Sequence, residues 1–406
     1  MAELKVEVVE IEEVIPHENA DRLELAKVYG YYVVVGLGEY KAGDHAVYFP
    51  VDSILPDDLR DFIFTGGKIT PVSRIRAAKI RGAVSQGLLV SIDKVEKYEQ
   101  QKSGSLWLPT NYTVGMNCTS RLSVTKHDPD KNKPAVMRGR QTSKKETHPL
   151  FRKYTDIQHQ KRYGDKAFEE GSMVILTEKI HGTNFRAGWV PNIPPDKIAE
   201  KRMSWWDEDA DYKVYRNPIK WLKQKLSLPK YTFVWGSHNV QLKPRDTQVH
   251  DSCKTERVNV YEQCVMANKL WSVIPYGQIW YGEIYGPSIQ KGYGYGLKDG
   301  ECDVRFFDVR MAATGEYLDF DHAIRIVQRA GAKMVPYWTA VYDTKHIDYV
   351  LNHKNGGMVS AIDPNTDIEG LVIRSPEEEK FLGSRRCILK WIGDAYLLKK
   401  GMTEYK

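Results

Sequence analysis

A lysine near the middle of the chain stands where an apolar run ends. The run Met173–Leu176 predicts a buried strand, and Gly182 predicts a turn shortly after Lys179. A lysine amine at the end of a strand can act as a nucleophile if it is partly buried and close to other cations. Both conditions make it lose its proton more readily than a solvated amine does. The alternative is a solvated lysine in a β-turn, which four residues alone do not exclude.

The residues on either side of Lys179 carry a resemblance. The sequence 179–182 (Lys-Ile-His-Gly), followed by 183–185 (Thr-Asn-Phe), resembles the nucleotidyltransferase signature of the ATP-dependent RNA ligases, in the His-containing form of the phage T4 RNA ligase 2 group. Five later stretches resemble the remaining motifs of that family in the same order: 233–239, 280–287, 304–309, 367–373 and 387–392. The resemblance covers roughly residues 150–397.

The resemblance implies a reaction and a role for each matching residue. Lys179 attacks the α-phosphorus of ATP and carries AMP, which then moves to an RNA 5′-phosphate before a 3′-OH seals the ends. Glu283 and Glu369 orient Mg²⁺ or Mn²⁺ through water, and Phe307 stacks on adenine. The full set of residues that the resemblance assigns to nucleotide binding is Thr177, Glu178, His181, Gly182, Asn184, His238, Glu283, Phe307, Glu369 and Lys390.

Two positions depart from the family pattern. Ile392 stands where the fifth motif of the ligase 2 group carries a second lysine, and His238 stands where an arginine is frequent. The first departure predicts weaker adenylyl transfer unless Arg374, Lys399 or Lys400 supplies the charge. For the second, Arg186 or Arg245 is the candidate substitute.

The first hundred residues predict a small barrel or sandwich, because short apolar and β-branched runs alternate with glycine turns. Stretches 16–23, 41–44 and 76–88 resemble the OB-fold tRNA-binding domain of the EMAP type. An OB domain ahead of the ligase core is also the arrangement of the Deinococcus-type RNA ligases. The cations expected to contact RNA are Arg74, Arg76, Lys79 and Arg81, with a solvated strand face as the alternative.

These observations predict an α+β protein. We expect an OB-type β-barrel at residues 1–125, a linker at 126–147 with one strand preceding it at 118–124, and an adenylyltransferase domain at 148–406. The adenylyltransferase domain is expected to be ATP-grasp-like, with antiparallel sheets, flanking helices and an insertion at about 190–230.

Composition excludes few classes of protein. The 406 residues carry a net charge of +6, which permits a polyanionic partner such as RNA without establishing one. The five cysteines are widely spaced and never form a Cys-x-x-Cys pair, which favours a reducing, cytoplasmic location. No signal peptide or membrane-spanning run is recognisable, so no membrane partner is expected.

Three other functions fit parts of this pattern. A capping guanylyltransferase is disfavoured because that family places its OB domain after the fifth motif and has Asp in the first motif. A DNA ligase is disfavoured by His181 and by the tRNA-binding-like module. A non-catalytic RNA-binding protein is favoured by Ile392 and His238, but disfavoured by the joint presence of Lys179, Glu283 and Glu369.

Overall fold

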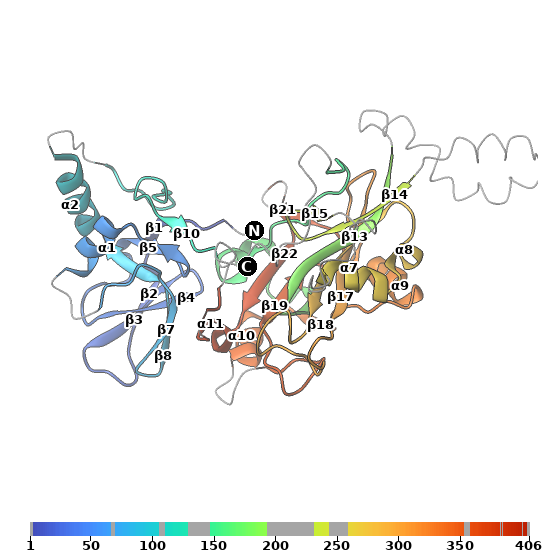
Figure 1. Cartoon of the computed structure of the whole chain (residues 1–406). Helices are drawn as coiled ribbons and strands as arrows, with labels where there is room; N and C mark the ends of the chain where they lie inside the picture. The colour runs from blue at the N-terminus through green and yellow to red at the C-terminus, as the bar shows by residue number, and fades with distance from the viewer. Residues whose placement is uncertain are drawn as a thin grey trace, which may run out of the picture.

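The computed structural model describes most of the chain. The described residues are 3–65, 70–104, 110–128, 147–192, 231–242, 259–352, 358–381, 383, 385–399 and 401–403. The predicted insertion at about 190–230 and the predicted linker therefore lie almost wholly outside the described residues. Figure 1 shows the N-terminal strands, in blue, as one body and the strands that contain the ligase motifs, in green to red, as the other.

Short strands wrap around a common apolar interior in the N-terminal body. Its strands form four small sheets, with orders β1-β5-β9, β2-β3-β4, β7-β8 and β10-β6. The elements are β1 (Glu7–Glu10), β2 (Glu13–Pro16), β3 (Leu23–Val28), β4 (Tyr31–Gly36), β5 (His45–Phe49), β6 (Ser53–Ile54), α1 (Asp57–Phe64), β7 (Ala77–Ile80), β8 (Ala83–Gln86), β9 (Leu88–Ser91), α2 (Ile92–Ser103) and β10 (Thr125–Lys126). Strand β4 alternates, with Tyr31, Val33 and Val35 buried and the residues between them half-buried.

The predicted strand at 118–124 is wrong. The Cys118 N–H donates to Val6 O at 2.7 Å, and the Leu122 N–H donates back to Cys118 O at 2.9 Å, which closes a turn. Leu122 and Val124 still fill the barrel core, so the apolar residues of this segment are buried from a loop. The strand that follows, β10, pairs with β6 and belongs to the barrel.

The second body is built on two five-stranded sheets. The first, which we call the Lys179 sheet, has the order β11-β22-β19-β12-β18, and the second, the Phe307 sheet, has the order β15-β14-β13-β16-β17. Their strands are β11 (Gln158–His159), β12 (Met173–Lys179), β13 (Thr183–Pro191), β14 (Tyr231–Gly236), β15 (Gln241–Leu242), β16 (Gln278–Tyr285), β17 (Asp303–Met311), β18 (Tyr337–Val341), β19 (Gly370–Arg374) and β22 (Ile388–Ile392). All pairings are antiparallel except that of β11 with β22.

Each large sheet has one face under helices and the other toward its partner sheet. The helices are α3 (Gln160–Ala167), α7 (Val260–Ala267), α8 (Leu270–Val273), α9 (Phe320–Arg329), α10 (Thr344–Asn352) and α11 (Asp394–Leu397), and a small hairpin pairs β20 (Lys380–Phe381) with β21 (Arg385–Arg386). Helices α7, α8 and α9, on the right in Figure 1, share an apolar core with the Phe307 sheet. A separate core joins Val190 and Ile279 of the Phe307 sheet to Ile388 of the Lys179 sheet, so the two sheets face each other.

The barrel contacts the edge of the Lys179 sheet and helix α3. The Gly30 N–H donates to Lys161 O at 2.8 Å, and the Tyr31 ring lies 5.4 Å from the His159 ring. The Lys161 amine donates to Gln86 Oε1 at 2.8 Å, and the Gln86 amide donates to Asp394 Oδ1 at 2.7 Å. These contacts fix strands β4 and β8 of the barrel against the second body, which contains the two five-stranded sheets.

A buried histidine at this contact makes stability depend on pH. Burial, and then the nearby Lys161 and Lys390 cations, hold the pKa of His159 well below its usual 6.5. Near pH 6 the unfolded chain therefore binds a proton that the folded chain does not, so stability falls as pH drops below about 6.5, by up to about 1.4 kcal/mol per pH unit. His159→Asn keeps an acceptor for the Lys161 N–H, which now bonds to His159 Nδ1 at 3.1 Å.

We expect His159→Asn to flatten this dependence when the free energy of unfolding is measured in urea at pH 7.5, 6.5 and 5.5. His322→Asn, at an exposed position on α9, is the matched control and should leave the slope unchanged. An unchanged slope in the His159 variant would show that this ring does not govern the acid sensitivity.

Among the residues that the structure describes, no helix combines the length and apolarity needed to cross a membrane.

Candidate active site

Lys179 lies at the end of β12 with its amine paired to a carboxylate. In the Lys179 sheet it stands opposite Gly370, and its Nζ forms an ion pair with Glu369 Oε1. The Glu369 side chain is only 2% exposed, whereas that of Lys179 is 21% exposed. The amine is therefore at the boundary between the protein interior and solvent, as a nucleophile that must meet a ligand requires.

Two cations keep Glu369 ionised. Burial alone would raise the pKa of this carboxyl group, but the Lys179 ammonium and His181 outweigh it and lower the pKa to about 2. His181 Nδ1 lies 3.1 Å from Glu369 Oε2. Glu369 is consequently a fixed negative charge near neutral pH, and it holds the Lys179 amine in place.

Three tyrosines enclose the His181 ring. The Tyr396 hydroxyl lies 3.0 Å from His181 Nδ1, and the Tyr293 ring meets the imidazole edge-on with centroids 4.6 Å apart. The His181 N–H donates to the Tyr295 hydroxyl at 2.7 Å. These contacts fix the orientation of His181 and, through it, that of Glu369. Nothing in the sequence singled out Tyr396, because it reaches the site only through the packing of α11.

Gly182 allows β13 to start close to β16. A Cβ atom at this position would lie 2.2 Å from Ile284 O and 2.9 Å from Glu283 Cγ, which are both too close. Only glycine at position 182 lets the turn come this close to Glu283. The resemblance predicts that Glu283 contacts the nucleotide.

We expect Gly182→Ala to displace this turn and to slow enzyme–AMP formation roughly 10²-fold, because reacting groups misplaced by about 1 Å lose that much rate. Single-turnover labelling of the purified protein measures the rate. Gly294→Ala is the control, since its new Cβ would meet nothing closer than 3.7 Å. Equal rates in the two variants would contradict a role for close packing at Gly182.

Lys390 lies on the same face as Lys179. The register aligns Thr177, Val372, Lys390 and His159 across four neighbouring strands, so their side chains share one face, and Lys179 is two residues beyond Thr177 on it. Lys390 is buried on this face, which turns toward the Phe307 sheet. Lys390 therefore lies on the side of the sheet that Lys179 faces, and the expectation that the two amines meet one ligand stays a prediction.

Glu178 points the other way. Its carboxylate accepts from the Ser360 hydroxyl at 2.5 Å and from the Ala361 N–H at 3.0 Å, and burial raises its pKa. Thr177 donates to Val372 O at 3.4 Å, within the sheet. In this structure both side chains bond to neighbouring segments and not across the space between the sheets.

Phe307 occupies a β-bulge. Tyr281 pairs with Asp308 and Gly282 pairs with Phe306, so Phe307 is the extra residue that has no partner on β16. Its ring lies 4.9 Å from that of Tyr154, and it packs against two apolar clusters that include Ile279 of the Phe307 sheet and Ile388 and Ile392 of the Lys179 sheet. The bulge turns the aromatic side chain into the space between the sheets, which is the place of the predicted adenine stack.

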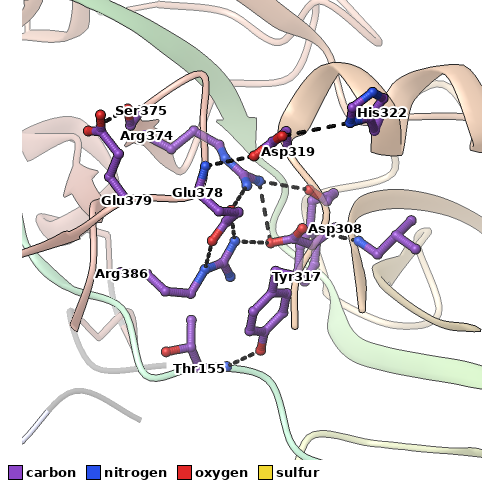
Figure 2. A network of polar contacts seen from close by, with 12 residues as sticks. Thr155, Asp308, Tyr317, Asp319, His322, Arg374, Ser375, Glu378, Glu379 and Arg386 are labelled. Atoms are coloured by element: carbon purple, nitrogen blue, oxygen red, sulfur yellow. Dashed lines mark hydrogen bonds and ion pairs between the residues drawn. The ribbon is translucent and has the colours of Figure 1, made fainter. Parts of the chain in front are cut away.

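A buried ion network joins the two sheets behind Phe307 (Figure 2). Asp308, 0% exposed, accepts from Arg386 Nη2 at 2.9 Å and from Arg374 Nη1 at 3.3 Å. Arg374 also donates to Glu378 at 2.6 Å, and its Nη1 lies 3.4 Å from Phe307 O. Burial would raise the pKa of Asp308, but the two guanidinium groups lower it. Its charge links β17 to β19 and β21.

Asn184 and Glu283 face the same space from the Phe307 sheet. They are cross-strand partners in β13 and β16, and both Glu283 and Glu369 raise the pKa of Tyr396 after the larger effect of its burial. Asn184 Oδ1 is buried and has no hydrogen-bond partner among the described residues. A buried acceptor beside two carboxylates suits a ligand or ion that supplies donors or positive charge.

His238 lies at the edge of the site beside Arg186. Burial, with the Arg186 and Lys153 cations as smaller effects, lowers the pKa of His238 to about 4, so its ring is neutral at pH 7. Arg186 is itself buried and donates to Ser237 O at 2.9 Å and Phe151 O at 2.7 Å. The other candidate substitute, Arg245, lies outside the described residues.

The barrel cations divide into two groups. Arg74 pairs with Asp52 at 2.6 Å and donates to Met402 O at 2.6 Å, so it connects the barrel to the segment after α11. Arg76, Lys79 and Arg81 are exposed along the β7–β8 hairpin. Within the described part of the chain, no three His, Cys, Asp or Glu side chains are grouped so as to hold a metal ion by themselves.

Comparison with known proteins agrees with this geometry. A model described as an OB-fold domain matches residues 5–92, and a model described as RNA ligase matches residues 172–392. The phenylalanine–tRNA ligase beta subunit of Ehrlichia canis (strain Jake) is 32% identical over 114 residues, which are 27% of this chain and only 13% of that protein.

The fold is shared with solved RNA ligase structures. A mutant Naegleria gruberi RNA ligase with ATP and Mn superposes with a TM-score of 0.66 at 20% identity, over 97% of this chain and 98% of that chain. The same ligase with PPi gives 0.65 at 20% identity, over 98% of both chains. The predicted OB-plus-nucleotidyltransferase fold is thereby confirmed. Because the RNA ligase model spans more than half of the 406 residues, the chain belongs to the RNA ligase family.

Proposed function

We propose that this protein is an ATP-dependent RNA ligase that joins 3′-OH and 5′-phosphate ends through an AMP group carried on Lys179. The observation that carries the proposal is the Lys179–Glu369 pair on a face that also presents Lys390, opposite Asn184 and Glu283. Solved structures of a similar RNA ligase, one with ATP and Mn and another with PPi, support the same chemistry.

The first step follows from the position of the Lys179 amine. The neutral amine attacks the α-phosphorus of ATP, a P–N bond forms, the bond to the bridging oxygen breaks, and pyrophosphate leaves while the amine gives up a proton. Release of Lys179 from Glu369 makes the amine available, and Lys390 would then hold the α-phosphate oxygens. Phe307, turned inward by its bulge, would stack on the adenine.

The later steps return Lys179 to its starting state. An oxygen of an RNA 5′-phosphate attacks the same phosphorus, so AMP moves to the RNA and the amine is freed. A 3′-OH then attacks the RNA phosphorus, loses its proton and expels AMP. Arg76, Lys79 and Arg81 on the exposed β7–β8 hairpin would contact the RNA backbone.

The residues fit a divalent cation as a helper. Glu283, Glu369 and the unpartnered Asn184 Oδ1 are oxygen donors, the kind that Mg²⁺ and Mn²⁺ prefer, and their small number fits an ion held mainly by waters and phosphates. When bound, such an ion neutralises the charge that develops on the leaving pyrophosphate.

The organisation of the chain and its location remain part of this proposal. We assign RNA binding to residues 1–125 and adenylyl transfer to residues 148–406. The described cysteines, Cys118, Cys264, Cys302 and Cys387, are all free thiols, which supports a reducing, cytoplasmic location.

Labelling with radioactive nucleotide tests the proposal. The purified full chain is treated with pyrophosphate to discharge any bound AMP, desalted, and incubated with α-labelled ATP or GTP and Mg²⁺ before denaturing electrophoresis. A labelled protein band with ATP is the expected result. Labelling by GTP alone would indicate a capping-type enzyme, and no label with either nucleotide would indicate a non-catalytic RNA-binding protein.

A further inference from the structure

A pocket lies where the barrel meets the segment after α11, apart from Lys179. Its volume is ≈ 250 Å³, and its walls come from Val51, Arg74, Arg76 and Ala77 of the barrel and from Leu397, Leu398, Lys399, Gly401 and Met402 of the other body. Sites that enclose a free small molecule usually measure about 300–1,000 Å³, so this smaller, partly open space suits a segment of a longer ligand.

Three of the residues that line the pocket are cations, and the others are apolar residues and a glycine. The Arg74 charge is balanced by the fully buried Asp52, but Arg76 is exposed and has no ion-pair or hydrogen-bond partner among the described residues. Lys126 and His127 lie close by, because the His127 N–H donates to Asp52 O at 2.9 Å. After burial, Arg74 and Arg76 contribute to lowering the pKa of His127, which confirms that these charges are near one another.

The opposite wall leads toward the active site. Lys399 lines the pocket, and its amine donates to Asp367 at 2.7 Å and to the Tyr293 hydroxyl at 3.1 Å. Tyr293 in turn packs against His181, the partner of Glu369. An anion seated between Arg76 and Lys399 would thus be connected to Lys179 through Tyr293, His181 and Glu369.

We infer that this pocket binds a backbone phosphate of the RNA substrate, so that Arg76 of the barrel and Lys399 of the catalytic body hold one strand together. The inference rests on the proposed ligase function and extends the RNA contact already assigned to Arg76 by adding Lys399 from the other body, so that the contact is complete only when the two bodies are joined. Recognition is by phosphate charge, so no base preference is expected from these residues.

The salt dependence of RNA binding tests the inference. The affinity of the full chain for a 5′-phosphorylated single-stranded RNA is measured by fluorescence anisotropy over a range of KCl concentrations. For Arg76→Ala and for Lys399→Ala alike, the slope of log affinity against log salt should become shallower by about 0.7, the contribution of one phosphate contact on a single strand. Lys97→Ala is the matched control, because Lys97 is an exposed cation on α2, far from the catalytic body in Figure 1, and its slope should equal that of wild type.

Two results would overturn the inference. One is an Arg76→Ala slope equal to that of wild type. The other is a shallower slope for Arg76→Ala with a wild-type slope for Lys399→Ala, which would assign Arg76 to the barrel's own RNA surface and not to this pocket. Enzyme–AMP formation by the wild-type protein is measured in parallel, so that a failure of the ligase proposal is recognised separately.

Discussion

Lys179→Ala should abolish enzyme–AMP formation, with a loss of at least about 10⁴-fold, because a covalent route without its nucleophile has no alternative group at the same place. The described site has Lys390 on the same face, but Lys390 is buried in β22, and the end of β12 is where the Lys179 amine meets Glu369. The measurement is the labelled band described above, with folding checked by circular dichroism.

Lys179→Arg separates chemistry from structure. The guanidinium group keeps the positive charge beside Glu369 but stays protonated, so it cannot attack phosphorus. We expect this variant to be as stable as wild type and as inactive as the alanine variant. Persistent labelling of either variant would place the nucleophile elsewhere.

Asp308→Ala should destabilise the fold by about 3–5 kcal/mol, because it removes the fully buried one of the two carboxylates that neutralise Arg374 and Arg386 and leaves only Glu378 beside them. Arg374 and Arg386 both bond to Asp308, and the Tyr154 hydroxyl donates to it at 2.8 Å. The free energy of unfolding, measured in urea at pH 7.5, reports the loss.

The control for this prediction is an exposed ion pair on the same strand. Lys333 pairs with Asp303 of β17 at 2.7 Å, but its side chain is 58% exposed. Lys333→Ala should therefore cost no more than about 1 kcal/mol. Similar losses in the two variants would mean that the Asp308 network contributes little to joining the sheets.

The sequence predicted only part of the candidate site directly. The apolar run before Lys179 predicts its strand, whereas Glu369 and Lys390 were assigned to the nucleotide by the resemblance alone. In the structure, strand pairing brings the three residues to one region, and their roles stay predictions.

The remaining parts depend on contacts between distant segments. The bulge at Phe307 arises from a register shift against β16, and the support of His181 by Tyr396 requires α11 to pack beside the site. Arg74 was expected at the RNA, but it is engaged with Asp52 and Met402. No periodicity in the chain encodes such pairings.

Ile392 shows what a departure from the family pattern means structurally. It lies opposite Gly370, which in turn lies opposite Lys179, so only a glycine separates the two side chains across the sheet. Its side chain is buried with Ile180 and Tyr396 in an apolar cluster. An apolar side chain therefore packs near Lys179 at the position where the family pattern has a lysine. The effect of this difference on adenylyl transfer stays a prediction.

The pairing of β12 with β19 has a consequence for how the protein reaches its active state. These strands place Lys179 beside Gly370, although nearly the whole catalytic region lies between them in the chain. Contacts of such long sequence separation form late, because the chain entropy lost in closing the loop must be offset before they stabilise anything. During refolding, the capacity to accept AMP should therefore return after most secondary structure has formed, which makes covalent labelling a sensitive reporter of the last folding step.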